Sequence, residues 1–217
     1  MTIKLYSYWR SSAAYRVRIA LNFKGLEYET VPVSLAPGVS EHRKEDYRAI
    51  NPQMLVPFLD DGRVAIGQSQ AILEYIEEAY QDPPLLPQSI EQCAQVRAFC
   101  NIICCDIHPL NNLRVRTYLK ESLGANKDEV RVWYAHWISA GFAAAEALIS
   151  DYADDGPYAF GADVTLADVC LVPQMYNAYV YDVPLDDYPR LVEVDAQCNR
   201  LPAFAAAIPE KQPDAPA

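Results

Sequence analysis

The sequence lacks three features that would assign it to particular classes of protein. It has no run of about 18 apolar residues, so no membrane span is expected. No charged-then-apolar leader precedes the first apolar strand, so export is not expected. Basic residues are scarce, with 18 Lys and Arg against 29 Asp and Glu and a net charge of −11. This balance argues against binding of nucleic acid, because neutralising phosphates requires a basic face.

The chain also lacks the cysteine spacing that is typical of a structural metal site. It has six cysteines, but no two of them form a C-x-x-C pair, and all six fall in segments with helical patterning. A zinc site uses paired ligands at fixed spacing, so none is expected here. We expect buried, reduced thiols in a cytoplasmic protein.

Residues 1–81 alternate between strand and helix patterns. An apolar strand at residues 3–6 is followed by a helix to Gly25, a strand at residues 28–33, a hairpin around Asp60-Asp61-Gly62, and a helix that opens at Gln68-Ser69. Pro32 predicts that its strand lies at a sheet edge or at an interruption of the ladder. This order predicts a thioredoxin-like α/β domain.

The remaining 136 residues after position 81 begin with a linker and then become helical. Residues 82–87 are rich in proline and predict a domain boundary, and residues 88–217 are expected to form an all-α domain. Ser89 with Gln92 predicts a capping box, and Pro109 is expected to bend the first long helix. A second helix is predicted from about residue 128 to residue 150. The tail from Pro209 is expected to pack loosely.

The segment Thr165-Leu-Ala-Asp168 also has the form of a capping box. A capping box satisfies backbone amides at a helix start, so we interpret Asp168 as a structural residue rather than a catalytic one.

The segment Trp9–Gly25 carries the clearest chemical signal. A strand leads directly into a helix start, and Ser12 is expected to be the N-cap of that helix. Unpaired N–H groups, the positive end of the helix dipole and two hydroxyls would meet at this point, which suits an anion. An ordinary capped helix is the structural alternative, and on this segment alone it is favoured.

The order of residues in this segment resembles a known active site. Arg-Ser-Ser-x-x-x-Arg-Val-Arg-Ile-Ala-Leu, at residues 10–21, resembles the active-site segment of zeta-class glutathione transferases, the family of maleylacetoacetate and maleylpyruvate isomerases. The resemblance extends to Val56-Pro57, to Gln68-Ser69 and through nearly the whole chain. It implies the glutathione transferase fold, a cis Val56–Pro57 bond and a homodimer.

The resemblance implies that glutathione is the cofactor and that Ser11, assisted by Ser12 and Arg10, acts at its thiol. A hydroxyl donor and a helix start can lower a thiol pKa from about 8.5. The implied contacts to glutathione are Ser11, Ser12, His42, Val56, Gln68, Ser69, His108 and Asn112. His108 and Asn112 lie four residues apart and are expected to share a helix face; a buried, satisfied polar pair is the alternative.

Three arginines are candidates for binding substrate carboxylates, namely Arg10, Arg16 and Arg114. Arg16 lies four residues after Ser12 on the same helix face, whereas Arg18 points away. An isolated arginine is usually a solvated surface residue, so the hypothesis is strongest for Arg10 and Arg114.

The implied reaction is cis–trans isomerisation of a maleyl keto acid, maleylacetoacetate to fumarylacetoacetate, by reversible thiolate addition in aromatic catabolism. The chain departs from the family pattern at Ala13, where cysteine is common, and at Val180, where the isomerases usually carry an arginine. Alternatives are therefore a maleylpyruvate isomerase, a glutathione transferase acting on another electrophile, and a non-catalytic binding protein of the same fold.

Overall fold

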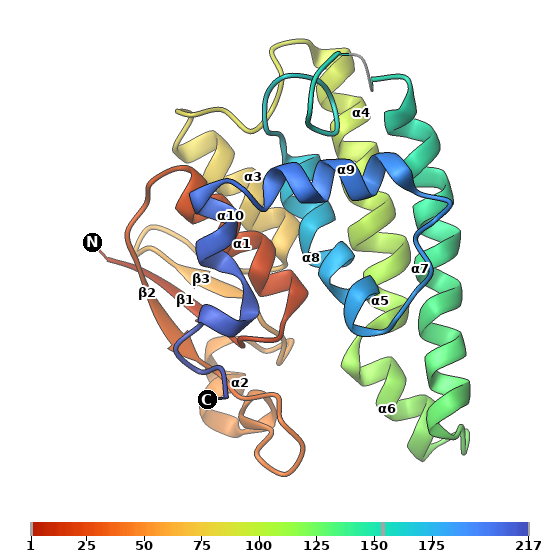
Figure 1. The fold of residues 1–217 in the computed structure, drawn as a ribbon. Coiled ribbons are helices and arrows are strands. Elements are labelled where there is room, and N and C mark those ends of the chain that lie inside the picture. Colours follow the sequence, from red (N-terminus) through yellow and green to blue (C-terminus); the bar gives the residue numbers. More distant parts are fainter. Residues whose placement is uncertain (1, 153–154, 217) are drawn as a thin grey trace. The chain divides into compact units, whose positions relative to one another are not determined.

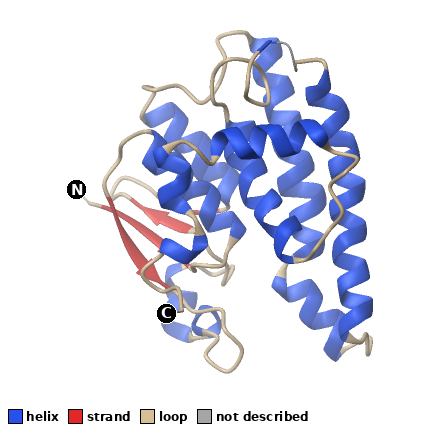
Figure 2. Ribbon diagram, in the orientation of Figure 1, coloured by secondary structure: helices blue, strands red, loops and turns tan. Residues whose placement is uncertain are grey.

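The computed structural model describes residues 2–152 and 155–216, which form two compact units. The first unit contains the chain up to Pro84 and also the residues from Arg200 onward, and the second spans Leu85–Asn199. The assignment of residues 88–217 to one helical domain therefore differs at its end, because the last helix packs on the first unit. Figure 2 shows the strands gathered in a single sheet, while the rest of the regular structure is helical.

The first unit is built on a four-stranded mixed sheet of order β2-β1-β3-β4. Its strands are β1 (Ile3–Ser7), β2 (Tyr28–Pro32), β3 (Phe58–Asp60) and β4 (Ala65–Gly67). Strand β1 pairs parallel with β2 and antiparallel with β3, with Leu5 opposite Leu59. The predicted hairpin is β3–β4, and Pro32 lies in the edge strand as expected.

Helices α1 (Ser12–Phe23) and α3 (Ser69–Ala79) belong to this unit and pack against each other. Every residue of α1 from Ser12 to Leu21 is buried, because the helix is enclosed by other elements on several sides. The short elements η1 (Glu41–Arg43) and α2 (Glu45–Ile50) fill the connection between β2 and β3.

The C-terminal segment covers α1. Helix α10 (Pro202–Ala207) lies beside α1 (Figure 1), and the side-chain amide of Asn22 donates to the Ala203 carbonyl at 3.0 Å. Element η4 (Pro209–Lys211) follows, and the backbone N–H of Trp9 donates to Asp214 at 2.9 Å. The expectation of a loosely packed tail is therefore wrong for residues 209–216, because the Asp214 bond holds the tail to the segment before α1 and the Lys211 and Gln212 side chains donate to carbonyls of residues 205–208.

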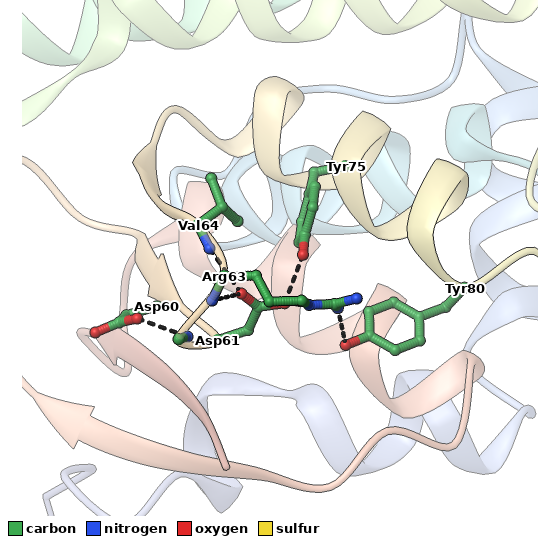
Figure 3. Close-up of polar contacts among 7 residues, drawn as sticks. Asp60, Asp61, Arg63, Val64, Tyr75 and Tyr80 are labelled. Carbon is green, nitrogen blue, oxygen red and sulfur yellow. Dashed lines mark hydrogen bonds and ion pairs between the residues drawn. The ribbon is translucent and has the colours of Figure 1, made fainter. Parts of the chain in front are cut away.

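A second polar cluster joins the hairpin to α3. Figure 3 shows Asp61, in the hairpin turn, accepting hydrogen bonds from Tyr75 at 2.5 Å, from Arg63 at 2.7 Å and from the backbone N–H of Val64 at 2.9 Å. Burial alone would raise the pKa of Asp61, but the hydrogen bonds from Tyr75, the Val64 and Arg63 amides and the Arg63 side chain outweigh it and hold the pKa below its usual range. Asp61 is thus a carboxylate that clamps the hairpin and not a candidate acid.

The second unit is helical. Its helices are α4 (Ile90–Asn101), the π-helix η2 (Ile102–Ile107), α5 (His108–Asn111), α6 (Leu113–Glu121), α7 (Lys127–Ser150), α8 (Leu166–Val180) and α9 (Pro189–Cys198). The break near Pro109 was predicted, but the regular helix already changes to π geometry at Ile102. At Gly141 of α7 an added Cβ would lie 2.3 Å from Ile107, so the two segments approach closely. No described helix is long and apolar enough to cross a membrane.

Carboxylates occupy several helix starts in the second unit. Thr165 and Asp168 form the predicted capping box of α8, and Asn126 and Glu129 form another at α7. Asp168 is fully buried and also accepts from the Ala159 amide at 2.9 Å, which supports its structural interpretation. At α4, Ser89 accepts from the Gln92 backbone N–H at 3.3 Å, but the predicted capping box is incomplete, because the Gln92 side chain does not return a bond and the Ser89 hydroxyl instead donates to Glu91 at 2.7 Å.

None of the six cysteines forms a disulfide. Cys100, Cys170 and Cys198 are buried and Cys93 and Cys104 are half-buried, but Cys105 is exposed. The expectation that all six thiols are buried is therefore confirmed for three of them, met only in part by Cys93 and Cys104, and wrong for Cys105.

Candidate functional site

The start of α1 carries the two serines singled out in the sequence. Ser11, not Ser12, is the N-cap: its backbone is extended and its hydroxyl accepts from the Ala14 amide at 3.2 Å. Ser12 is the first helical residue and is buried. The capping prediction is thus wrong by one residue, because both serines suit an N-cap and only the backbone decides where the helix begins.

The capping bond leaves Ser11 with a usable donor. Its oxygen accepts from an amide, so its own hydrogen is available to a negatively charged group placed before the helix. The first turn of α1 contains no acidic residue that would occupy this position itself. Arg10 lies half-buried in the turn just before the helix, where the Ser11 amide donates to the Tyr8 carbonyl at 2.9 Å.

The start of α3 is a second helix end without an acid. Gln68 precedes the helix with a φ of 69°, a left-handed value that is uncommon for a residue other than glycine, and its side chain does not cap the helix. The side-chain amide of Gln68 instead donates to the side-chain oxygen of Gln53 at 2.7 Å. Ser69 is buried, and the first turn has no acidic residue. The geometry again suits an anion.

Arg16 connects these two helices. It is only 1% exposed, and its Nη1 donates to the Ser69 hydroxyl at 3.3 Å. The expectation that a lone arginine is solvated is wrong here. Arg18 is buried as well, and it points away toward α10, where its Nε donates to the Ala207 carbonyl at 3.1 Å.

Val56 offers backbone groups for pairing. The Val56–Pro57 bond is cis, as the resemblance implied. In the described part of the chain, the amide and the carbonyl of Val56 have no hydrogen-bond partner. The preceding carbonyl, that of Leu55, accepts from Tyr47 at 2.7 Å and from Asn51 at 2.8 Å, which holds this segment in place.

His42 lies in η1 and is buried rather than on the surface. Its Nδ1 is 3.4 Å from the Ser34 carbonyl. Burial lowers the pKa of His42 below its usual value, with the Ser34 bond opposing that shift. A neutral ring that donates through Nδ1 presents a lone pair at Nε2.

The remaining predicted residues belong to the second unit. His108 begins α5, whereas Asn112 is the N-cap of α6 and accepts from the Arg114 amide at 3.1 Å. They do not share a continuous helix face, because the chain turns to an extended conformation at Asn112. Arg114 is exposed in the first turn of α6.

Sequence reasoning missed Arg116. Its guanidinium lies 5.4 Å from the ring centroid of Tyr134 and 5.6 Å from that of Tyr181, and it donates to the Tyr181 hydroxyl. The two rings stack with centroids 3.7 Å apart. Tyr181 follows Val180, so this cation lies beside the position where the sequence lacks an arginine. Only the aromatic content of the neighbouring helices could have indicated the contact.

A groove of about 540 Å³ in the second unit is mainly apolar. It runs between η2, α5 and α7 and is lined by Ile102, Cys105, Asp106, Ile107, Pro109, Leu110, Trp137, Ala140, Gly141 and Ala144. None of the predicted site residues lines it. No group of His, Cys, Asp and Glu in residues 2–152 and 155–216 could hold a metal ion.

Comparison with known proteins gives concordant matches. Residues 5–84 match the family model of the glutathione S-transferase N-terminal domain. A protein of Vibrio cholerae named probable maleylacetoacetate isomerase is 46% identical over 215 residues, covering 99% of each chain. A holo structure of maleylpyruvate isomerase, a bacterial zeta-class glutathione S-transferase, superposes with a TM-score of 0.95 at 47% identity, covering 98% of this chain and 100% of that one.

A further solved structure was determined with a ligand. Maleylacetoacetate isomerase from Anaeromyxobacter dehalogenans, with glutathione bound in its active site, has a TM-score of 0.86 and 41% identity, covering 99% of this chain and 98% of that one.

Proposed function

Because the chain belongs to the zeta-class glutathione transferase family, we propose that it is a glutathione-dependent cis–trans isomerase of a maleyl keto acid. Maleylacetoacetate and maleylpyruvate are the candidate substrates, in the breakdown of aromatic compounds. The observation that carries the proposal is the pair of acid-free helix starts at α1 and α3, joined through Arg16 and Ser69.

The residues of the first unit fit glutathione. The peptide has anionic ends and one thiol, and the unit offers a hydroxyl donor at Ser11, an anion site at Gln68-Ser69 and unpaired backbone groups at Val56. His42 would face the glycyl end. A cis-proline segment that presents one unpaired amide and one carbonyl suits the two antiparallel hydrogen bonds of a peptide backbone.

Glutathione, when bound, supplies the thiolate that adds reversibly to the double bond and allows rotation about it. The chain would contribute three things. Ser11 would donate its hydroxyl hydrogen to the sulfur and so favour the charged form. The α1 start would add a partial positive charge. Arg10 and Arg114 are the candidate residues for binding substrate carboxylates, and a fixed positive charge of this kind stabilises negative charge that develops during the reaction in many enzymes.

The test follows the fate of the cofactor. Maleylpyruvate and maleylacetoacetate are each incubated with the protein and a trace of glutathione, and product geometry and free thiol are measured together. We expect the trans product in large excess over glutathione, with the thiol conserved. Loss of one thiol for each product molecule would instead show a transferase that conjugates its substrate.

Val180 favours that transferase as the second candidate. The residue is 47% exposed and apolar, where the isomerases usually carry arginine. An arginine–carboxylate contact is worth roughly 1.5–3 kcal/mol, or one to two decades in kcat/KM. Val180→Arg should therefore raise kcat/KM for the dianionic substrates through a lower KM, and it should lower activity on apolar electrophiles. Val180→Leu is the matched control, which changes shape without adding charge.

We also propose that the protein is a cytoplasmic homodimer. The family resemblance supports the dimer, and so do Ile90 and Val132, two apolar residues of the second unit that are 82% and 69% exposed. Six cysteines without a disulfide are consistent with a reducing compartment. Sedimentation at micromolar concentration tests the dimer, and the mass of a single chain would refute it.

A further inference from the structure

Two neighbouring arginines of α1 are buried in very different states. Arg18 is satisfied: its Nε donates to the Ala207 carbonyl, its Nη1 to the Ser7 hydroxyl at 3.2 Å and its Nη2 to the Trp9 carbonyl at 3.2 Å. Arg16 makes one hydrogen bond, to Ser69, and its Nε and Nη2 are buried without a partner among the described residues. Arg18 is therefore explained by the fold, and Arg16 is not.

A buried cation of this kind is costly. Taking a charge out of water carries a large penalty, which proteins usually offset with a paired carboxylate. Arg16 has no acidic partner in the part of the chain that the structure describes. Its single contact leads to the first residue of α3, whose first turn also lacks an acid. We therefore expect the negative charge that compensates Arg16 to come from a ligand, bound on the side of Ser69 that faces away from Arg16.

We propose that Arg16 is a positioning residue that makes the start of α3 selective for a carboxylate, which is the γ-glutamyl carboxylate if the proposed function holds. Arg16 donates to Ser69 Oγ and so occupies one lone pair of that oxygen. The hydroxyl hydrogen is then directed toward the ligand, where it joins the free amides of the helix start. Arg16 itself does not touch the ligand.

The buried charge adds a second contribution. The field of a guanidinium behind the helix start has the same sign as the helix dipole, and it is weakly screened because Arg16 is only 1% exposed. A neutral ligand gains little from either effect. The competing explanation is that Arg16 only ties α1 to α3, in which case its loss would weaken all ligands equally.

The experiment separates these explanations by ligand selectivity. Calorimetry measures the Kd of glutathione and of an analogue in which the γ-glutamyl α-carboxylate is replaced by hydrogen, for wild type and for Arg16→Met. We expect wild type to prefer glutathione at least tenfold, and Arg16→Met to lose about tenfold of its preference, the usual scale for one charge-assisted contact. Arg18→Met is the matched control, which should lower the Tm but keep the preference.

An unchanged preference in folded Arg16→Met would overturn the inference. If that variant does not fold, Arg16→Gln decides, because glutamine stays polar but removes the charge and reaches less far toward Ser69. A preference lowered at least threefold would support the role of Arg16, and the wild-type value would overturn it. A failure of the proposed function gives a different result, because wild type would then bind neither ligand. Equal binding of both ligands by wild type would leave the glutathione site in place and would overturn only the role proposed for Arg16.

Discussion

Helices α1 and α3 of the first unit begin without a carboxylate, whereas α7, α8 and α9 of the second unit each begin with one. Glu129 and Asp168 complete capping boxes, and Glu146 of α7 accepts from two amides at the start of α9, both at 2.9 Å. At all five starts the first amides lack a partner within the helix backbone, and the helix dipole has its positive end. At α7, α8 and α9 a carboxylate accepts from these amides and stabilises the helix, whereas α1 and α3 have no acid in their first turns, and we propose that a ligand takes that place.

The largest effect should follow removal of the buried acid at α8. Asp168→Ala leaves the amides of Ala159 and Thr165 and the Thr165 hydroxyl without their acceptor in the interior, so we expect a loss of about 3 kcal/mol in the free energy of unfolding. Urea denaturation measures it. Asn126→Ala, at the exposed box of α7, is the matched control and should cost about 1 kcal/mol. Equal losses would contradict the distinction between the buried and the exposed box.

The next effect concerns the cap of α1. Ser11→Ala should raise the pKa of the bound glutathione thiol by about one unit, or about 1.4 kcal/mol, because the hydroxyl donor is lost. It should also cost about 1 kcal/mol of stability as a lost cap. Thiolate absorbance against pH measures the first quantity.

Ser12→Ala is the control for that substitution, since Ser12 is not the cap. A smaller shift is expected there, and an identical titration of wild type and Ser11→Ala would remove Ser11 from the mechanism.

Adding an acid to α3 would erase its difference from α8. Ala71 is exposed in the first turn of α3, so Ala71→Glu brings a carboxylate to the helix start. We expect stability to rise by about 0.3–1 kcal/mol and glutathione affinity to fall about fivefold, because the new carboxylate competes for the same charge. Ala71→Gln provides a neutral control. Unchanged affinity in the glutamate variant would show that the ligand carboxylate lies elsewhere.

The smallest expected effect is a pH dependence of ligand affinity. It would come from His42, a side chain that titrates, whereas the amides of the helix starts do not. With Nδ1 directed to Ser34, neutral His42 presents a lone pair to a carboxylate, so an anion would favour the protonated ring. A ligand that raises the pKa of His42 binds more tightly as pH falls through the window between the bound pKa and the free pKa, which lies below 6.5. We expect about a threefold gain.

S-methylglutathione is the suitable ligand for this measurement, because it has no thiol to titrate. His42→Asn should give a flat profile between pH 8 and pH 5. A flat profile in wild type would mean that His42 does not face a carboxylate.

Local sequence patterns predicted most of the fold. The order of strands and helices, the hairpin at Asp61-Gly62 and the box at Thr165–Asp168 follow from short-range spacing and turn chemistry, and all three are present. The errors occur where two adjacent residues suit the same role, as with Ser11 and Ser12, or where a helix changes its geometry before the residue expected to break it, as at Ile102. The family resemblance, not spacing alone, made Val56 and Gln68 candidates for ligand contact, and these roles stay predictions.

By itself the sequence determined the class of fold and the family, because seventeen residues around Ser11 and the turn and cap signals are local and specific. It also determined that α1 and α3 begin without acids, since that can be read from the chain. Only the tertiary structure decided the state of the arginines. Arg16 and Arg18 have the same chemistry two residues apart, but α10 folds back to satisfy Arg18, while Arg16 meets only Ser69. Partners that lie 53 and 189 residues away in the chain have no signature in local sequence, and they decide how fully each buried guanidinium is hydrogen-bonded.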